Sequence, residues 1–151
     1  MELNHPNSTM TFDPNPGWFL GPFDIYDRED SLGENLNKYD PLEPDQLQKL
    51  FDEYFFNHID KEHGYTVEHK AAIVNCLIEA LNKDTYDFSQ HLPNYEDEEN
   101  YFFLPSNWEF PRPRYIFEQA YMASARHWGK ELKEVGLKLP DSNMVGIREC
   151  S

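Results

Sequence analysis

Apolar residues recur at helical spacing in three parts of the chain and predict its main elements. The first pattern follows Pro44 and has the i, i+3, i+4, i+7, i+8 spacing of an amphipathic helix: Leu47, Leu50, Phe51, Tyr54 and Phe55. The second begins at Thr66, whose hydroxyl can cap a first turn, and runs to about Leu81. Its expected buried face comprises Val67, Ala71, Val74, Leu77, Ile78 and Leu81. The short link between the two helices predicts an antiparallel hairpin.

The longest helical pattern covers about Tyr115 to Val135. Its apolar face comprises Ile116, Phe117, Ala120, Tyr121, Ser124, Trp128, Leu132 and Val135. Gly136 follows at the place where a left-handed C-terminal cap is expected. Gly129 lies inside this pattern and costs a helix up to about 1 kcal/mol relative to alanine, so we expect it to permit close packing.

The first 44 residues have a different character, because they contain six of the eleven prolines. An apolar cluster lies among them: Trp18, Phe19, Leu20, Phe23, Ile25 and Tyr26. We expect an irregular arm, with at most a short edge strand, that packs over the core through these aromatics. The alternative is an exposed aromatic patch used for binding. Leu32 and Leu36 fit a short helical turn.

These patterns predict a mainly α fold: a helical hairpin plus a long C-terminal helix, with extended Pro-rich segments around them. The chain is expected to form a single domain over 1–151, with an arm (1–44), a helical core (45–136) and a tail (137–151). The alternative is an α+β fold with a small sheet built from residues 18–26, 100–104 and 143–148.

Charge is unevenly distributed and narrows the class of partner. The chain has a formal net charge of −15, and residues 1–110 hold 23 acidic side chains against 6 basic ones. Residues 111–151 are slightly basic. Such a field repels nucleic-acid phosphates and anionic membranes and attracts basic proteins. We therefore expect no direct nucleic-acid or membrane binding. The N-terminus has neither the basic start nor the apolar run of a signal peptide, which favours a cytoplasmic location.

Candidate catalytic or cofactor chemistry is sparse. Four potential metal ligands lie within twelve residues: His58, Glu62, His63 and His69. His58 and His63 are five apart, which places them on different faces of a helix, so surface or hydrogen-bonded roles near a helix end are favoured over a metal site. Cys76 lies within an apolar helical pattern, unlike a reactive thiol. The glycines are scattered singly and cradle no phosphate. We expect no cofactor and no catalytic residue.

The most unusual stretch is residues 94–110, NYEDEENYFFLPSNWEF, where four consecutive carboxylates lie among aromatics. Phe102, Phe103, Trp108 and Phe110 are expected to anchor the segment to the core. The alternatives for the rest are a solvated loop or a negative, Tyr-rich contact site, because tyrosines supply contact area and carboxylates steer basic partners. The predicted contact surface is Tyr95, Glu96, Asp97, Glu98, Glu99 and Tyr101, with Asp84 and Asp87 as outer steering charges.

Basic residues gather later in the chain, and Arg126, Lys130 and Lys133 share one face of the last predicted helix. The stripe either neutralises acids from the N-terminal half or docks an acidic partner or second subunit.

In size, charge and aromatic content the chain resembles the small acidic immunity proteins that neutralise bacterial toxins. The resemblance involves no shared motif, so no residue role is carried over from it. It implies a non-enzymatic inhibitor that occupies the cationic cleft of a basic toxin, such as a nuclease. Two alternatives stay open: a mimic of DNA charge directed at restriction or CRISPR proteins, and a small metal-dependent enzyme that uses the histidine cluster. A structural or adaptor module that uses Trp18–Tyr26 is a further class. The oligomeric state is not predicted.

Overall fold

The computed structural model describes residues 11, 14–25, 29–57, 65–83, 85–92, 103–105, 108, 110–137 and 139. These residues form a mainly α fold, as the sequence predicts, and no strand forms among them. The α+β alternative is not observed in this part of the chain. Its first segment is helical from Pro16 to Phe23 instead, and residues 143–148 lie outside the described residues.

Short helical turns alternate with longer helices along the chain. The 3₁₀ helices are η1 (Pro16–Phe23) and η4 (Phe88–His91), and two π-helical turns are η2 (Glu29–Gly33) and η3 (Phe51–Phe56). The α-helices are α1 (Glu34–Leu36), α2 (Pro44–Leu50), α4 (Val67–Leu81) and α5 (Arg114–Glu134).

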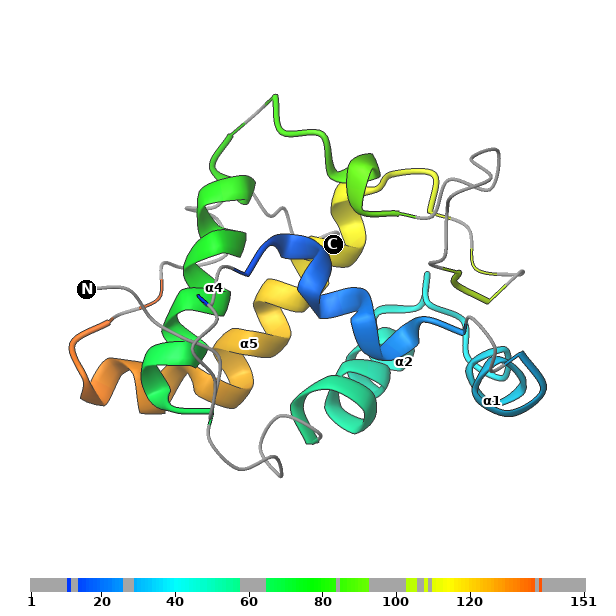
Figure 1. The fold of residues 1–151 in the computed structure, drawn as a ribbon, viewed down its shortest axis with the longest axis horizontal. Coiled ribbons are helices and arrows are strands. Elements are labelled where there is room, and N and C mark those ends of the chain that lie inside the picture. The colour runs from blue at the N-terminus through cyan, green and yellow to red at the C-terminus, as the bar shows by residue number, and fades with distance from the viewer. Residues whose placement is uncertain are drawn as a thin grey trace.

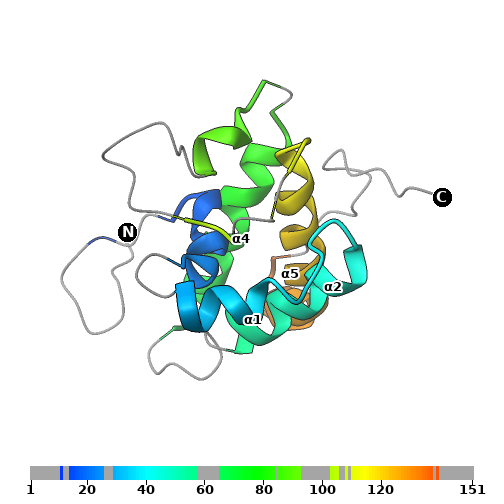
Figure 2. The same ribbon diagram turned by 90° about the vertical axis from the view of Figure 1, so that its right-hand side faces the viewer.

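Helix α5 is the element on which the others pack. Helix α4 lies along it, and the continuous α2–η3 segment packs against another part of it. The 3₁₀ helix η1 lies across α4, α5 and η3 (Figure 1). The predicted hairpin is therefore not the main packing unit, since α4 makes its most extensive contact with α5 rather than with α2–η3. Helix α1 packs with the neighbouring turn η2 at one end of the molecule (Figure 1), and this end faces the viewer in Figure 2.

The core is dominated by large aromatic side chains. Trp128 and Tyr121 of α5 are buried beside three phenylalanines of η3, Phe51, Phe55 and Phe56. The arm contributes fully to this core through buried side chains of η1: Phe19, Leu20 and Phe23.

Contacts between the arm and the rest agree with the expectation that it packs through its aromatics. Trp18 meets the ring edges of Phe55 and Tyr65 at centroid distances of 5.7 and 5.9 Å. Farther along, the Ile25 amide donates to the Phe103 carbonyl (2.8 Å), and the Phe103 amide donates to the Asp24 carboxylate (3.1 Å). Two segments of the alternative sheet thus do meet, without forming a strand pair.

Both predicted caps of the long helices are present. Thr66 accepts from the His69 amide and His69 reciprocates from its ring, which forms a capping box at the start of α4. After α5, Gly136 has a φ of +93°, and the Leu137 amide donates to the Leu132 carbonyl (2.9 Å). These bonds form a Schellman motif, in which glycine avoids the strain of a left-handed conformation.

Three details of the helical patterns differ from the prediction. Val135 is 59% exposed, because it is the C-cap residue and no longer follows the α5 spiral. Gly129 permits no close packing, since an added Cβ would meet nothing within 4 Å. In α4, the buried face includes His69, Ile73 and Ala80, whereas Val67, Ala71 and Ile78 are only partly buried. The face in contact with α5 and η1 is therefore rotated from the predicted one.

A π-helical turn continues α2 and changes which side chains face the core. Phe51 and Phe56 are five residues apart, and both are completely buried. In an α-helix this spacing would place them on different faces, whereas the wider π turn brings them together. Tyr54, which the α-helical pattern places in the buried stripe, is only half-buried.

Candidate functional site

Most of the predicted contact surface lies outside the described residues. This applies to Tyr95, Glu96, Asp97, Glu98, Glu99, Tyr101 and Asp84. Asp87 is described, and it is exposed. Its carboxylate accepts from the Ser89 amide (3.0 Å) and from the Ser89 hydroxyl, which caps the short helix η4. Asp87 therefore has a local structural role, and its role as a steering charge stays a prediction.

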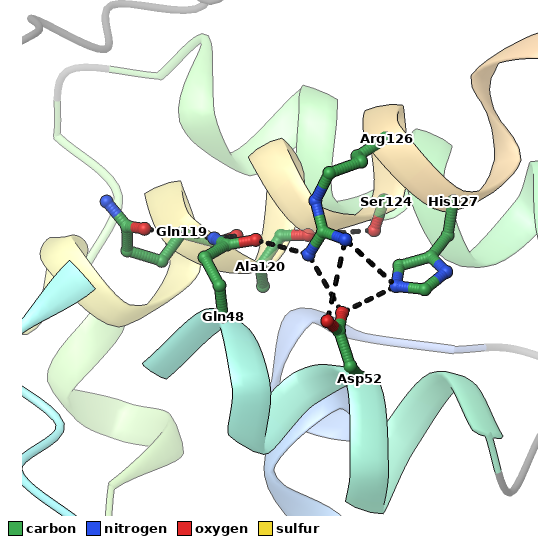
Figure 3. A network of polar contacts seen from close by, with 7 residues as sticks. All are labelled: Gln48, Asp52, Gln119, Ala120, Ser124, Arg126 and His127. Atoms are coloured by element: carbon green, nitrogen blue, oxygen red, sulfur yellow. Dashed lines mark hydrogen bonds and ion pairs between the residues drawn. The ribbon is translucent and has the colours of Figure 1, made fainter. Parts of the chain in front are cut away.

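The densest polar cluster joins the π turn to α5 (Figure 3). The Asp52 carboxylate accepts from Arg126 Nη2 at 2.8 Å and lies 2.5 Å from His127 Nε2. Arg126 Nη1 lies 3.5 Å from the second Asp52 oxygen, so two guanidinium nitrogens contact the two carboxylate oxygens. One acid of η3 thus holds two adjacent residues of α5.

Two glutamines extend this network along the helix contact. Gln48 Oε1 accepts from Arg126 Nη2 (2.8 Å), and Gln48 Nε2 donates to both the backbone carbonyl and the side-chain oxygen of Gln119 (3.0 Å each). The α2–η3 segment is therefore tied to α5 by polar bonds over more than one turn.

The π turn explains how Asp52 and His127 come together. Phe56 stacks on the His127 ring with a centroid distance of 4.4 Å and an interplanar angle of 11°. Phe56 is directed toward α5 because η3 is wider than an α-helix, and Asp52 faces α5 one turn earlier. The histidine is consequently fixed by a ring on one side and a carboxylate at its Nε2.

Burial acts to raise the pKa of Asp52, but hydrogen bonds and charges from Arg126 and His127 outweigh it and hold the pKa below 3.8. The carboxylate is accordingly ionised at neutral pH.

Asp52 and His127 do not form a hydrolytic triad with the nearby Ser124. The Ser124 hydroxyl is buried and donates to the Ala120 carbonyl of its own helix (2.8 Å). We interpret the cluster as a contact between helices.

For Arg126, the cluster also agrees with the interpretation that the basic stripe neutralises acids of the N-terminal half. Lys130 and Lys133, the other residues of the stripe, are exposed.

The histidine cluster is only partly described, since His58, Glu62 and His63 lie outside the described residues. His69 is buried at the start of α4 rather than near the end of a helix. Its Nδ1 lies 3.1 Å from the Thr66 amide and 2.9 Å from the Thr66 hydroxyl. The capping bonds thus occupy Nδ1 of His69, which is one of the two ring nitrogens that could bind a metal ion. Within the part of the chain that the structure describes, no group of three metal-ligating side chains occurs.

Tyrosines and carboxylates come together on the surface near α1 and α2. We name this the α2 acidic face, and its members are Tyr39, Asp40, Glu43, Glu53, Tyr54 and Tyr115. The Tyr39 hydroxyl lies 3.5 Å from Glu53 Oε2. Burial, together with Asp40 and Glu43, raises the pKa of Tyr115 to about 12. Burial, Tyr39 and Glu53 likewise raise the pKa of Tyr54. Burial is the larger cause of both shifts, and the carboxylates of Asp40, Glu43 and Glu53 add to it.

Hydrogen bonds from Trp108, Tyr115 and Gln46 hold the loop that carries this face. The Trp108 indole donates to the Leu36 carbonyl (3.3 Å), and the Tyr115 hydroxyl donates to the Pro41 carbonyl (3.1 Å). Gln46 accepts from the Asp40 amide (2.8 Å). An open hollow of about 460 Å³ lies above the loop. Leu42 beside it is 49% exposed. The loop therefore presents apolar and acidic groups on a supported backbone.

Sequence patterns did not reveal the α2 acidic face, because its members come from separate segments. Tyr39 lies in the loop between α1 and α2, Tyr54 in η3 and Tyr115 in α5, and the acids between them are spaced rather than consecutive.

No helix in the described ranges is long and apolar enough to cross a membrane. Comparison with known proteins finds no match for this chain among family models, curated proteins or solved structures.

Proposed function

We propose that this chain is a non-enzymatic, acidic binding protein of the immunity type, which neutralises a basic toxin such as a nuclease by occupying its cationic cleft. The observation that supports the proposal best is the α2 acidic face, where carboxylates and tyrosines gather on a loop held by Trp108 and Tyr115. The acidic segment from Tyr95 to Tyr101 is a second contact region in this proposal.

Charge gives such a protein its rate of association. A net charge of −15 attracts a cationic partner over distances comparable to the Debye length, which is about 10 Å at 0.1 M salt. A nuclease cleft is lined with lysine and arginine to hold phosphates. Carboxylates placed in that cleft compete directly with the substrate.

In this proposal, tyrosines and a loop that is already ordered slow the dissociation of the complex. Tyr39 and Tyr54 offer large, rigid contact area with few rotatable bonds. The loop from Leu36 to Pro41 is already ordered by hydrogen bonds to two buried or half-buried aromatics, so binding need not order it. This lowers the entropic cost of association.

The test uses the basic protein encoded next to the gene for this chain, prepared as a catalytically inactive variant. Stopped-flow association is measured at 50 and 300 mM salt. Replacing Glu96, Asp97, Glu98 and Glu99 by lysine is expected to slow association by about 10- to 1,000-fold. Inhibition of the active form of the same protein by the wild-type chain completes the test.

A matched control reverses four exposed acids that belong to neither contact region: Asp30, Glu68, Glu79 and Glu134. This variant makes the same change in net charge without changing the proposed contact, so a smaller effect on the association rate is expected. The proposal fails if the partner does not bind at low salt, or if the 96–99 reversal leaves the rate unchanged while circular dichroism shows an intact fold.

A further inference from the structure

A half-buried histidine, His91, lies where the N-terminal arm meets η4. Its Nε2 is 2.7 Å from the Tyr86 hydroxyl, and its ring is nearly parallel to the Tyr86 ring at a centroid distance of 5.8 Å. Phe117 of α5 presents an edge to the same ring at 5.7 Å. Aromatic groups therefore enclose the imidazole on two sides.

The arm approaches the third side with its backbone. A Cβ placed on Gly17 would lie 3.0 Å from His91 Nδ1 and 3.3 Å from His91 Cβ. Only glycine allows this approach without a shift of the neighbouring chain. Gly17 is held by its own amide, which donates to the Asn15 side chain (2.9 Å) at the N-cap of η1. His91 is thus the point at which η1 contacts η4.

The surroundings of His91 favour the neutral ring. Among the described residues of the arm, Gly17 lies against the ring with Asn15 beside it, and both are uncharged. Helix α5 offers the Phe117 ring, while the Arg114 guanidinium lies over Phe88 at 5.7 Å. On its own turn, Asp87 favours the charged ring, but its carboxylate already accepts from Ser89. Burial outweighs Asp87 and lowers the pKa of His91 below 6.5.

We propose that His91 is a pH-sensitive clasp that holds the first turn of η1, at Gly17, against η4 while its ring is neutral and releases that turn when the ring is protonated. The His91 ring shares a hydrogen bond with the Tyr86 hydroxyl at Nε2, and the hydroxyl can either donate or accept there. Protonation places a hydrogen on both ring nitrogens, so a positive charge enters a half-buried aromatic enclosure. Loss of the close contact at Gly17 lets water reach the Nδ1 side of the ring and solvate that charge. The clasp is independent of the proposed binding function.

The direction of the pH dependence follows from the lowered pKa of His91. The contribution of His91 to stability is fully present above pH 6.5, and it is lost as pH falls through the lower value of the folded state. The chain contains five other histidines, so the effect must be isolated with a variant. His91→Phe keeps an aromatic ring and removes the titration.

The experiment records ¹H–¹⁵N spectra of the full chain from pH 7.5 to 4.5. The Gly17 amide is expected to shift with a midpoint below 6.5, together with amides of η4, and this response is expected to be absent in His91→Phe. A Gly17 response that is absent in the wild type, or unchanged in the variant, would overturn the proposal.

Tyr86→Phe is the second variant, in case His91→Phe does not fold. Without the hydroxyl, Nε2 loses its partner, so the midpoint at Gly17 is expected to move while the titration itself remains. An unmoved midpoint would show that the Tyr86 bond has no part in the clasp.

Discussion

Gly129 and Gly136 differ in what a methyl group would do. Gly129 lies within α5 in open space, so Gly129→Ala is expected to stabilise the protein by about 0.5–1 kcal/mol through the helix propensity of alanine. Gly136 has a φ of +93°, so Gly136→Ala is expected to destabilise it by about 1–2 kcal/mol. Urea unfolding of both variants checks the pair. Equal signs for the two changes would contradict this interpretation of α5.

Asp52 supports a second prediction, because two residues of α5 depend on it. Asp52→Asn is expected to cost roughly 0.5–1 kcal/mol at pH 7, a value typical of partly exposed ion pairs that solvent screens. The pKa of Asp52 is lowered on folding, so its contribution is present above pH 3.8 and lost as pH falls through the folded value.

The measurement is the free energy of unfolding of the wild type and Asp52→Asn in urea at pH 7 and at pH 2.5. The difference between the two proteins should shrink at the lower pH, because acid favours the neutral form of the wild-type carboxyl. A difference that stays constant would mean that shape rather than charge matters at this position.

At the scale of elements, the junction of α4 and α5 depends on Arg114. Its guanidinium donates to the Leu81 carbonyl at the end of α4 (2.8 Å) and to Glu118, which is 4% exposed (3.1 Å). Arg114→Ala would leave the Glu118 charge poorly compensated, and we expect a loss of about 2–4 kcal/mol. Thermal and urea unfolding measure it.

Arg112 offers the matched control, because it also binds Glu118 (2.8 Å) but its side chain is 62% exposed. Arg112→Ala is expected to cost less than about 1 kcal/mol. If both arginines cost the same, the bond from Arg114 to Leu81 contributes nothing to the junction.

The elements also show how much of the secondary structure the helical periodicity of the sequence predicts. The span of α5 agrees with the predicted helix to within one residue at each end, and Thr66 caps α4 as expected. The π turn was not predicted, because the spacing of Leu47, Leu50, Phe51 and Phe55 is compatible with an uninterrupted α-helix. Burial of Phe56 against His127 selects the wider turn.

At the scale of the whole molecule, repulsion among acids is the dominant electrostatic effect. With a net charge of −15, the compact state is destabilised by its own field. Raising NaCl from 20 to 500 mM at pH 7 is expected to increase the Tm by several degrees, since salt screens these charges. Differential scanning calorimetry measures this shift. A Tm that falls with salt would mean that ion pairs such as Arg126–Asp52 outweigh the repulsion.

Local rules were enough for the α-helices α2, α4 and α5, for the caps at Thr66 and Gly136 and for the mainly α class. Helical spacing depends only on neighbours a few residues away, and a cap depends on the type of one residue, as at Thr66 and Gly136. Single-domain organisation and the acidic contact at residues 95–101 stay predictions, since the latter lies outside the described residues.

Contacts between distant segments depend on the tertiary structure. The α2 acidic face, the Asp52–Arg126–His127 cluster and the enclosure of His91 each join residues from separate elements. They form because α4, η3 and η1 pack on α5 around one aromatic core. No pattern along the chain carries that information, because the partners of each side chain are set by packing across the core.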